Sequence, residues 1–205
     1  QEFDGTGLDP ERLDSALQRL VLRHPMLSVA FRDDGTQVRL PASSWMGLVR
    51  HDLRGLSEVM GETALLALRE RLSHQLLDVE AGHCISFEIA LLPEGRHRLF
   101  AGIDLLIADA ASYAQLFDEL GSLLTGQELP PIDPGYDFFS YTQQIRDLSA
   151  PRRESARQYW QAQLDSLPAA PSLPLTCAPA QIRPVRILRR KRRLEPDQWQ
   201  VFKRH

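Results

Sequence analysis

The sequence predicts an α/β protein, because its apolar residues switch repeatedly between the spacing of a strand and the spacing of a helix. Apolar residues alternate in 85–91 and again in 98–103, and Pro93-Glu94-Gly95 between them predicts the turn of a hairpin. Leucines three and four residues apart elsewhere predict amphipathic helices. Apolar residues make up 43% of the 205-residue chain, which is enough for a sizeable buried core.

Residues 1–5 resemble the end of a strand, and a helix is expected to follow. Asp9 is placed to accept hydrogen bonds as its N-cap, and Pro10 suits the first helical position, where a missing N–H costs nothing. Pro25 should end this helix. The imidazole of His24 is interpreted structurally, because a helix C-terminus favours a partly positive group. The predicted buried stripe is Leu13, Leu17, Leu20 and Val21.

A hairpin should come next, with strands at 27–31 and 37–40 and a tight turn containing Gly35. A short strand is then predicted at 48–53. Leucines 65, 68, 72 and 76 predict a long helix from Ser57 to Asp78. We expect the charged face of that helix to be solvated; it consists of Arg69, Glu70 and Arg71.

Two acids and a serine lie where the strand at 98–103 gives way to a helix. Asp104 continues the strand and shares a face with Phe100 and Gly102, among apolar groups. Burying a carboxylate costs several kcal/mol or more unless it is paired, so Asp104 requires a partner. Asp109 precedes the helix at 113–124, and Ser112 lies three residues later, so Asp109 is equally well explained as a helix N-cap.

The C-terminal third predicts a loop at 127–135, helices at 138–148 and 151–167, and an extended segment at 168–184. The second of these helices is expected to pack through Ala156, Tyr159, Trp160 and Leu164. A last helix begins at Glu195-Pro196, with Trp199 and Phe202 on one face. A basic cluster precedes it and is interpreted as the solvated face of a strand, with contact to an acidic carrier-protein helix as the alternative: Arg183, Arg186, Arg189, Arg190, Lys191, Arg192 and Arg193.

Composition and motifs argue against several classes of function. The 24 basic and 27 acidic residues nearly cancel, so no overall field attracts nucleic acid or an anionic membrane. No apolar run is long enough to span a membrane, and the default compartment is the cytoplasm. Cys84 and Cys177 fit no redox or metal spacing, and His74 and His83 suggest no metal site either. Glycine-rich phosphate loops and GxSxG elbows are absent from the sequence.

Asp104, Asp109 and Ser112 match the pattern Asp-x-x-x-x-Asp-x-x-Ser. Here the chain resembles the heterocyclization domains of nonribosomal peptide synthetases, which carry this pattern where the related condensation domains have His-His-x-x-x-Asp-Gly. The resemblance is closest to siderophore synthetases of the pyochelin and yersiniabactin type. Further stretches fall in the family's order: residues 23–27 with Phe31, residues 52–55, residues 72–74, and Tyr159-Trp160.

The resemblance implies a chloramphenicol-acetyltransferase-like fold, in which two lobes with mixed sheets flanked by helices form a V around a substrate tunnel. Residues 1–180 would be the N-terminal lobe, without its first strand and opening motif, and residues 181–205 a crossover strand and the start of the C-terminal lobe. Upstream and downstream peptidyl carrier domains would present substrates on 4'-phosphopantetheine, beside an adenylation domain. The resemblance implies no directly bound cofactor and no metal.

The implied reaction joins an upstream acyl thioester to a carrier-bound cysteine, serine or threonine and then closes a thiazoline or oxazoline ring. Asp104, Asp109 and Ser112 are the site residues carried over from the family. Leu105 stands where condensation domains keep their second histidine and cannot transfer a proton. The resemblance therefore places the acid and base in a Thr/Asp pair of the C-terminal lobe.

One departure concerns Ser28, where relatives usually carry an arginine that is a plausible partner of the signature acids. Its loss leaves the pairing of Asp109 open. Two alternatives stand beside heterocyclization: condensation without ring closure, and a non-catalytic domain that docks carrier proteins. We also expect this chain to have no catalytic turnover by itself, because the tunnel needs walls from both lobes.

Overall fold

The structure is a computed structural model that divides into two compact units, Gln1–Ala169 and Ala170–His205, which are described separately. Its described residues are 1–41, 45–133, 135–169, 171, 174–183, 190 and 193–204. The first unit contains β1 (Glu2–Thr6), α1 (Pro10–Arg23), β2 (Val29–Phe31), β3 (Gln37–Arg39), β4 (Val49–Asp52), α2 (Glu58–Ser73), β5 (Ile85–Leu91), β6 (Arg96–Ile103), α3 (Ala110–Leu124) and α4 (Phe138–Gln163). The second contains α5 (Pro196–Phe202).

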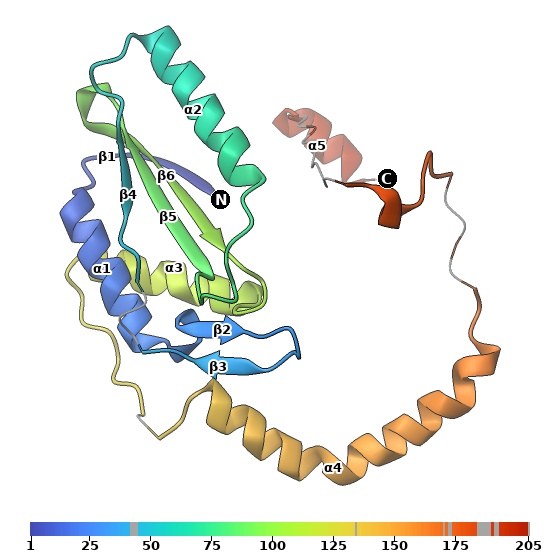
Figure 1. Cartoon of the computed structure of the whole chain (residues 1–205). Coiled ribbons are helices and arrows are strands. Elements are labelled where there is room, and N and C mark those ends of the chain that lie inside the picture. Colours follow the sequence, from blue (N-terminus) through green and yellow to red (C-terminus); the bar gives the residue numbers. More distant parts are fainter. Residues whose placement is uncertain are drawn as a thin grey trace. The chain divides into compact units, whose positions relative to one another are not determined.

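A four-stranded mixed sheet organises the first unit, in the order β1-β6-β5-β4 (Figure 1). β6 runs antiparallel to both β1 and β5, whereas β4 runs parallel to β5. A parallel neighbour requires a crossover, and α2 supplies it between β4 and β5. β2 and β3 form a separate antiparallel pair, which the sequence predicted. The predicted α/β class is therefore confirmed.

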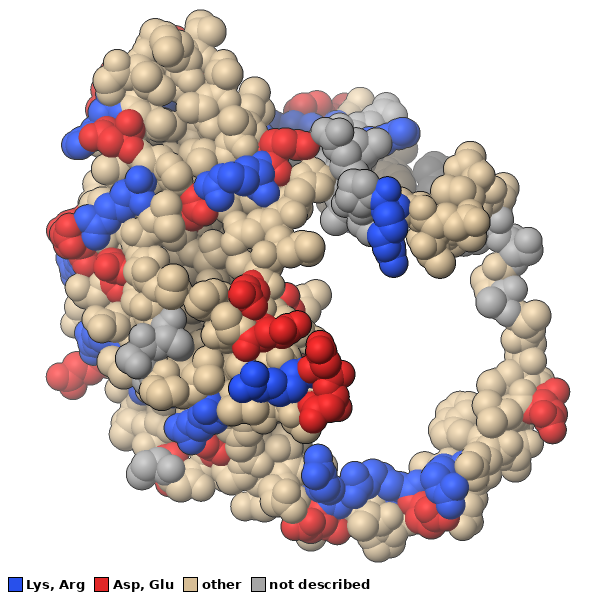
Figure 2. Space-filling model, viewed as in Figure 1, with Lys and Arg blue, Asp and Glu red and all other residues tan. Residues whose placement is uncertain are grey.

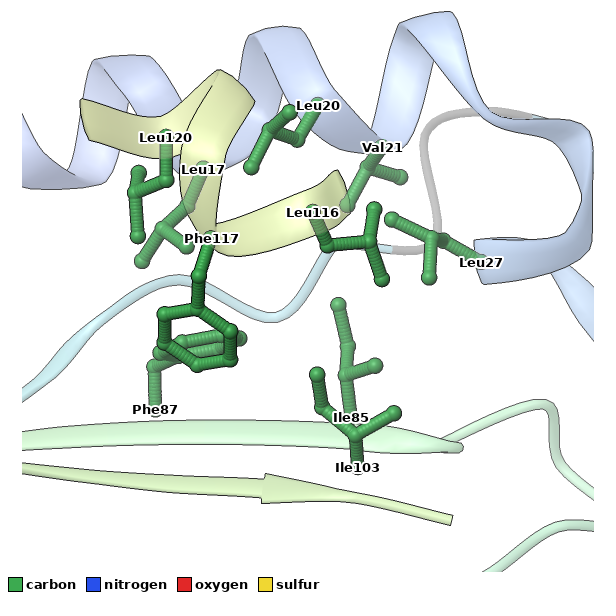
Figure 3. A pocket seen from close by; sticks show the side chains of 10 residues that line it. All are labelled: Leu17, Leu20, Val21, Leu27, Ile85, Phe87, Ile103, Leu116, Phe117 and Leu120. Atoms are coloured by element: carbon green, nitrogen blue, oxygen red, sulfur yellow. The ribbon is translucent and has the colours of Figure 1, made fainter. Parts of the chain in front are cut away.

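Helices cover both faces of the sheet, and the alternation of side chains along β6 shows how. Leu99 and Ala101 belong to the main core with α1 and α3, while Phe100 lies in a smaller core with Leu65 of α2. Figure 3 shows side chains of α1, α3, β5 and β6 meeting in the main core. The space left among them is about 10 Å³, roughly one water-sized sphere, so it is a packing gap and not a ligand site.

The local signals at α1 are confirmed. The Asp9 side chain accepts a hydrogen bond from the Glu11 N–H (2.9 Å), Pro10 is the first helical residue, and the helix ends at Arg23. The four predicted stripe residues are all buried. In the following hairpin Gly35 has a φ of +79°, the left-handed conformation that the tight turn requires.

Helix α2 is shorter than predicted, since it ends at Ser73 and not at Asp78. The segment beyond it contacts β2, where the Phe31 N–H donates to the Val79 carbonyl (2.9 Å). Leu76 is consequently 95% exposed and takes no part in the predicted stripe. The expectation of a merely solvated charged face is also wrong, because Arg69 pairs with Glu2 and Arg71 with Glu88.

The two helices predicted at 138–148 and 151–167 are one continuous helix, α4, with Pro151 inside it. Pro151 lacks the N–H that would continue the hydrogen-bond ladder. The carbonyl that loses this donor is that of Asp147, and the Arg153 guanidinium donates to the neighbouring Arg146 carbonyl (2.6 Å). No described residue of α4 is buried: Tyr159 and Trp160 are each 59% exposed and pack on each other, with ring centroids 5.3 Å apart, so their predicted core role is wrong here.

In the second unit, α5 begins after Glu195 as predicted, and the rings of Trp199 and Phe202 stack with centroids 5.6 Å apart. Arg183, Arg190 and Arg193 are exposed. The rest of the predicted basic strand lies outside the described residues: Arg186, Arg189, Lys191 and Arg192. Over the part of the chain that the structure describes, none of the helices has both the length and the apolar character needed to cross a membrane.

Candidate functional site

Asp104 is held at the end of β6 by three hydrogen bonds. Its backbone N–H donates to the Cys84 carbonyl (2.9 Å), and its own carbonyl accepts from the Ile107 N–H (3.2 Å). Its carboxylate accepts from the Leu106 N–H (2.9 Å). The Asp104 side chain is half-buried and bonds within its own turn. The partner expected from the sequence for this carboxylate is therefore the backbone N–H of Leu106, two residues ahead.

Asp109 caps α3, as the sequence predicted. Its Oδ1 atom accepts from the backbone N–H of Ser112 (2.8 Å) and from the Ser112 hydroxyl (2.7 Å). These two hydrogen bonds, the backbone one first, hold the pKa of the Asp109 carboxyl below its usual range. Asp109 is therefore an exposed anion at neutral pH, and Ser112 is its structural partner as well as its neighbour in the motif.

The junction brings Asp104, Asp109 and Ser112 into one turn without binding the two acids to each other. Among the described residues, each carboxylate accepts only from its own half of the turn. Ile107 and Ala108 are 7% exposed and anchor the turn in the core. Leu105 and Leu106 face outward, with exposed fractions of 82% and 53%. The turn thus presents apolar side chains between two hydrogen-bond-accepting carboxylates.

Ser28 and the Cys84 thiol form hydrogen bonds to groups other than the two acids. Ser28, where an arginine was expected by resemblance, is 2% exposed, and its backbone bonds to the Pro25 carbonyl (3.1 Å) and the Leu40 N–H (2.7 Å). Cys84 lies beneath the junction, fully buried, and donates from Sγ to the Val29 carbonyl (3.3 Å). Burial, with the Asp104 charge, raises the pKa of this thiol to about 11, so it stays protonated.

Glu119 of α3 is a charged residue that sequence reasoning missed. It is 9% exposed and accepts hydrogen bonds from Arg23, His24 and Gln115. The signal was present, because Glu119 interrupts the apolar stripe of α3 between Leu116 and Leu120. His24 keeps the structural role predicted for it, with Glu119 as its partner.

A second buried acid, Glu88, lies on the α2 side of the sheet. Its carboxylate receives two hydrogen bonds from Arg71 (3.1 and 2.6 Å) and one from His51 (2.6 Å). In Figure 2, positive and negative side chains alternate over the visible face of the first unit, which fits such pairing. Among the described residues, no group of three or more His, Cys, Asp or Glu side chains is placed to hold a metal ion.

The sequence that forms this site is similar to those of known proteins. Residues 4–199 match the model of the condensation domain. The phenyloxazoline synthase MbtB of Mycolicibacterium paratuberculosis is 40% identical over 178 residues, covering 85% of this chain and 15% of that protein. The pyochelin synthetase PchE of Pseudomonas aeruginosa is 36% identical over 188 residues, covering 92% and 13%. The chain therefore spans less than one sixth of either relative.

A solved structure extends the likeness to three dimensions. The EpoB cyclization-docking bidomain of the nonribosomal peptide synthetase from Sorangium cellulosum matches all of this chain and 41% of its own, with a TM-score of 0.82 and 28% identity. The synthetase FmoA3 matches 84% of this chain with a TM-score of 0.69 and 31% identity. The mixed sheet flanked by helices is thus the chloramphenicol-acetyltransferase-like arrangement that was predicted. The chain belongs to the condensation-domain family.

Proposed function

We propose that this chain is the N-terminal lobe of a heterocyclization domain in a nonribosomal peptide synthetase. The observation that carries the proposal is the junction from Asp104 to Ser112: Asp104 follows β6, Asp109 is the N-cap of α3, and Ser112 lies in the first turn of α3. The names of similar proteins support it, since one is a phenyloxazoline synthase, one a pyochelin synthetase and one a cyclization domain. Residues 1–180 would form the lobe, and residues 181–205 the crossover to the second lobe.

The proposed reaction has two stages. The amine of a carrier-bound cysteine, serine or threonine attacks the upstream acyl thioester, the thiol of the upstream phosphopantetheine leaves, and an amide forms. The side-chain thiol or hydroxyl then attacks the amide carbonyl, and loss of one water leaves a thiazoline or oxazoline. The expected setting is a cytoplasmic siderophore assembly line with carrier and adenylation domains.

Different parts of the site serve the two stages. Condensation depends mostly on holding two tethered reactants together, which supplies much of the rate without a proton-transfer group. Ring closure and water loss require an acid and a base. Asp109 is already used as a cap and Asp104 faces its own turn, so both are suited to shaping the tunnel and accepting hydrogen bonds from substrate. The acid and base are proposed to come from the Thr/Asp pair of the C-terminal lobe.

Intact-mass analysis of the downstream carrier tests the reaction. The complete domain, supplied with an acyl-loaded upstream carrier and a cysteinyl, seryl or threonyl downstream carrier, is expected to give a product one water lighter than the open amide. The open amide alone with all three amino acids would replace heterocyclization by plain condensation. No product from a folded domain that still binds both carriers would favour the docking role.

This chain by itself, given the same loaded carriers, is expected to give neither amide nor ring. The proposed acid and base and the second tunnel wall both lie in the other lobe. Repeated turnover by residues 1–205 alone would show that one lobe suffices and would contradict this division of labour.

A further inference from the structure

Glu119 is a charged side chain on the apolar side of α3. Its neighbours along the helix, Leu116, Leu120 and Leu123, are 4–8% exposed and belong to the main core. A carboxylate in such a place is costly unless every lone pair that faces the protein has a donor. Its position therefore calls for an explanation beyond packing.

The donors of Glu119 come from two different elements. Oε2 accepts from Arg23 Nε (3.0 Å) and lies 2.6 Å from His24 Nε2, while Oε1 accepts from Gln115 Nε2 (2.9 Å). Arg23 is the last residue of α1 and His24 is its C-cap, whereas Gln115 precedes Glu119 by one turn of α3. One carboxylate thus fastens the end of α1 to the middle of α3.

The placement of Glu119 also relates it to the candidate site. Ser112 and Glu119 are seven residues apart on α3, and at about 100° per residue they fall within roughly 20° of the same side of the helix, about 10 Å apart along its axis. Any rotation of α3 that moves Glu119 also redirects Ser112. Because Asp109 accepts from Ser112, its carboxylate turns with them.

We propose that Glu119 is a positioning residue, which fixes the rotation of α3 about its axis and thereby the direction in which Ser112 and Asp109 face. The apolar contacts of Leu116, Leu120 and Leu123 hold α3 against the core, but apolar attraction is non-directional. Charge-assisted hydrogen bonds from Arg23 and His24 have defined directions and add the missing constraint. The consequence for catalysis rests on the proposed function, whereas the orientation of α3 does not.

The charge state of Glu119 agrees with this role. Burial raises the pKa of its carboxyl, but the hydrogen bonds from Gln115 and His24, with the charges of His24 and Arg23, outweigh burial and leave the pKa below its ordinary value. Glu119 is therefore an anion at neutral pH, which is the form that accepts from all three donors.

A fluorine probe at the site tests the orientation without requiring activity. In the complete domain, Ser112→Cys is labelled with a trifluoromethyl thiol reagent after the other reactive cysteines have been replaced by serine; within this chain that is Cys177, which is exposed, whereas Cys84 is buried. One sharp ¹⁹F resonance is expected with Glu119 present. Glu119→Leu should shift and broaden or split that resonance, and Asp118→Leu, which removes the same charge from an exposed position of the same helix, should not.

Folding is checked separately by the thermal midpoint and near-ultraviolet circular dichroism. If Glu119→Leu does not fold, Glu119→Gln replaces it, since the amide keeps the shape and weakens the pairing with Arg23 and His24. A folded Glu119 variant whose resonance matches that of Asp118→Leu overturns the proposal. A changed resonance in both variants overturns it too, because the effect would then follow helix charge and not Glu119.

The reaction gives a second readout in unlabelled protein with Ser112 intact. Glu119→Leu should lower kcat for ring formation by ten-fold or more, since misplacement by about 1 Å can cost about a hundred-fold, while KM for the carriers stays within two-fold. Equal loss through KM would indicate a carrier surface instead and would contradict positioning. If the parent forms no ring, the proposed function fails and the fluorine experiment still decides the role of Glu119.

Discussion

The imidazole of His97 lies directly against the backbone of Gly5. A Cβ atom placed on Gly5 would lie 2.7 Å from His97 Nε2 and 2.8 Å from Cε1. The two residues are partners in the register of β1 and β6. This edge of the sheet therefore accommodates a buried histidine only because its neighbour has no side chain.

Gly5→Ala is expected to destabilise the protein by about 1–3 kcal/mol, the usual cost of overpacking. His97→Ala should make the same Gly5 substitution nearly neutral, because it removes the ring that the new methyl group meets. Denaturant unfolding of the two single variants and the double variant measures the coupling. Gly61→Ala is the control, since nothing lies within 4 Å of its added Cβ. Additive effects of Gly5→Ala and His97→Ala would contradict the steric relationship.

The same histidine should make stability depend on pH. Burial lowers the pKa of His97, against the opposing charge of Asp4, and Nδ1 has no hydrogen-bond partner among the described residues. Below its ordinary pKa of about 6.5 the unfolded chain binds a proton that the folded chain does not. The free energy of unfolding contributed by His97 is thus present above that pH and falls as the pH falls. Denaturant melts at pH 8 and pH 5.5 should show a smaller difference in His97→Asn than in the parent, and an equal difference would refute this.

Asp109→Ala and Asp104→Ala are expected to differ in what they cost. Asp109→Ala removes the cap of α3 and should lower both stability and activity of the complete domain. Asp104→Ala removes only the side-chain acceptor of the Leu106 N–H, so it should lower mainly activity. Denaturation midpoints measured beside product mass separate the two. An unchanged midpoint for Asp109→Ala would remove the capping role.

Glu88→Ala is expected to lower the free energy of unfolding by about 1–3 kcal/mol, because it removes the acceptor that Arg71 and His51 share, while water partly solvates both side chains, which are 51% and 25% exposed. Glu62→Ala on exposed α2 surface is the control and should stay within about 0.5 kcal/mol. Chemical denaturation of both variants provides the comparison. A loss below about 1 kcal/mol for Glu88→Ala would mean that its partners are solvated without it.

The elements that sequence reasoning placed well carry their signals locally. The alternation in β5 and β6 fixes which face of the sheet each residue occupies. The pair Asp109 and Ser112 marks the start of α3 by an N-cap signal that lies within four consecutive residues. The signature turn was therefore predictable in position. Its detail was not, because the partner of Asp104 is the Leu106 N–H, which depends on the conformation of the turn.

The failures have long-range causes. Arg69 and Glu2 are 67 positions apart in the sequence, so no spacing within α2 announces their pairing. Beyond the end of α2, Val79 accepts a hydrogen bond from Phe31, which lies far away in the sequence, and the buried Glu119 accepts one from Arg23 at the end of another helix. Pro151 was expected to divide two helices, but α4 continues through it from Phe138 to Gln163.

The pairing of β1 with β6 has a consequence during synthesis. Asp4 of β1 and Arg98 of β6 are joined by two hydrogen bonds although 94 positions separate them. At about 5–20 residues per second, the ribosome needs roughly 5–19 seconds to deliver the second strand after the first. Throughout that interval the β6 partner of β1 is missing, whereas β5 and β6 emerge together as a hairpin. The long-range pairing of β1 with β6 therefore forms only after β6 has been made, whereas the pairing of β5 with β6 is local.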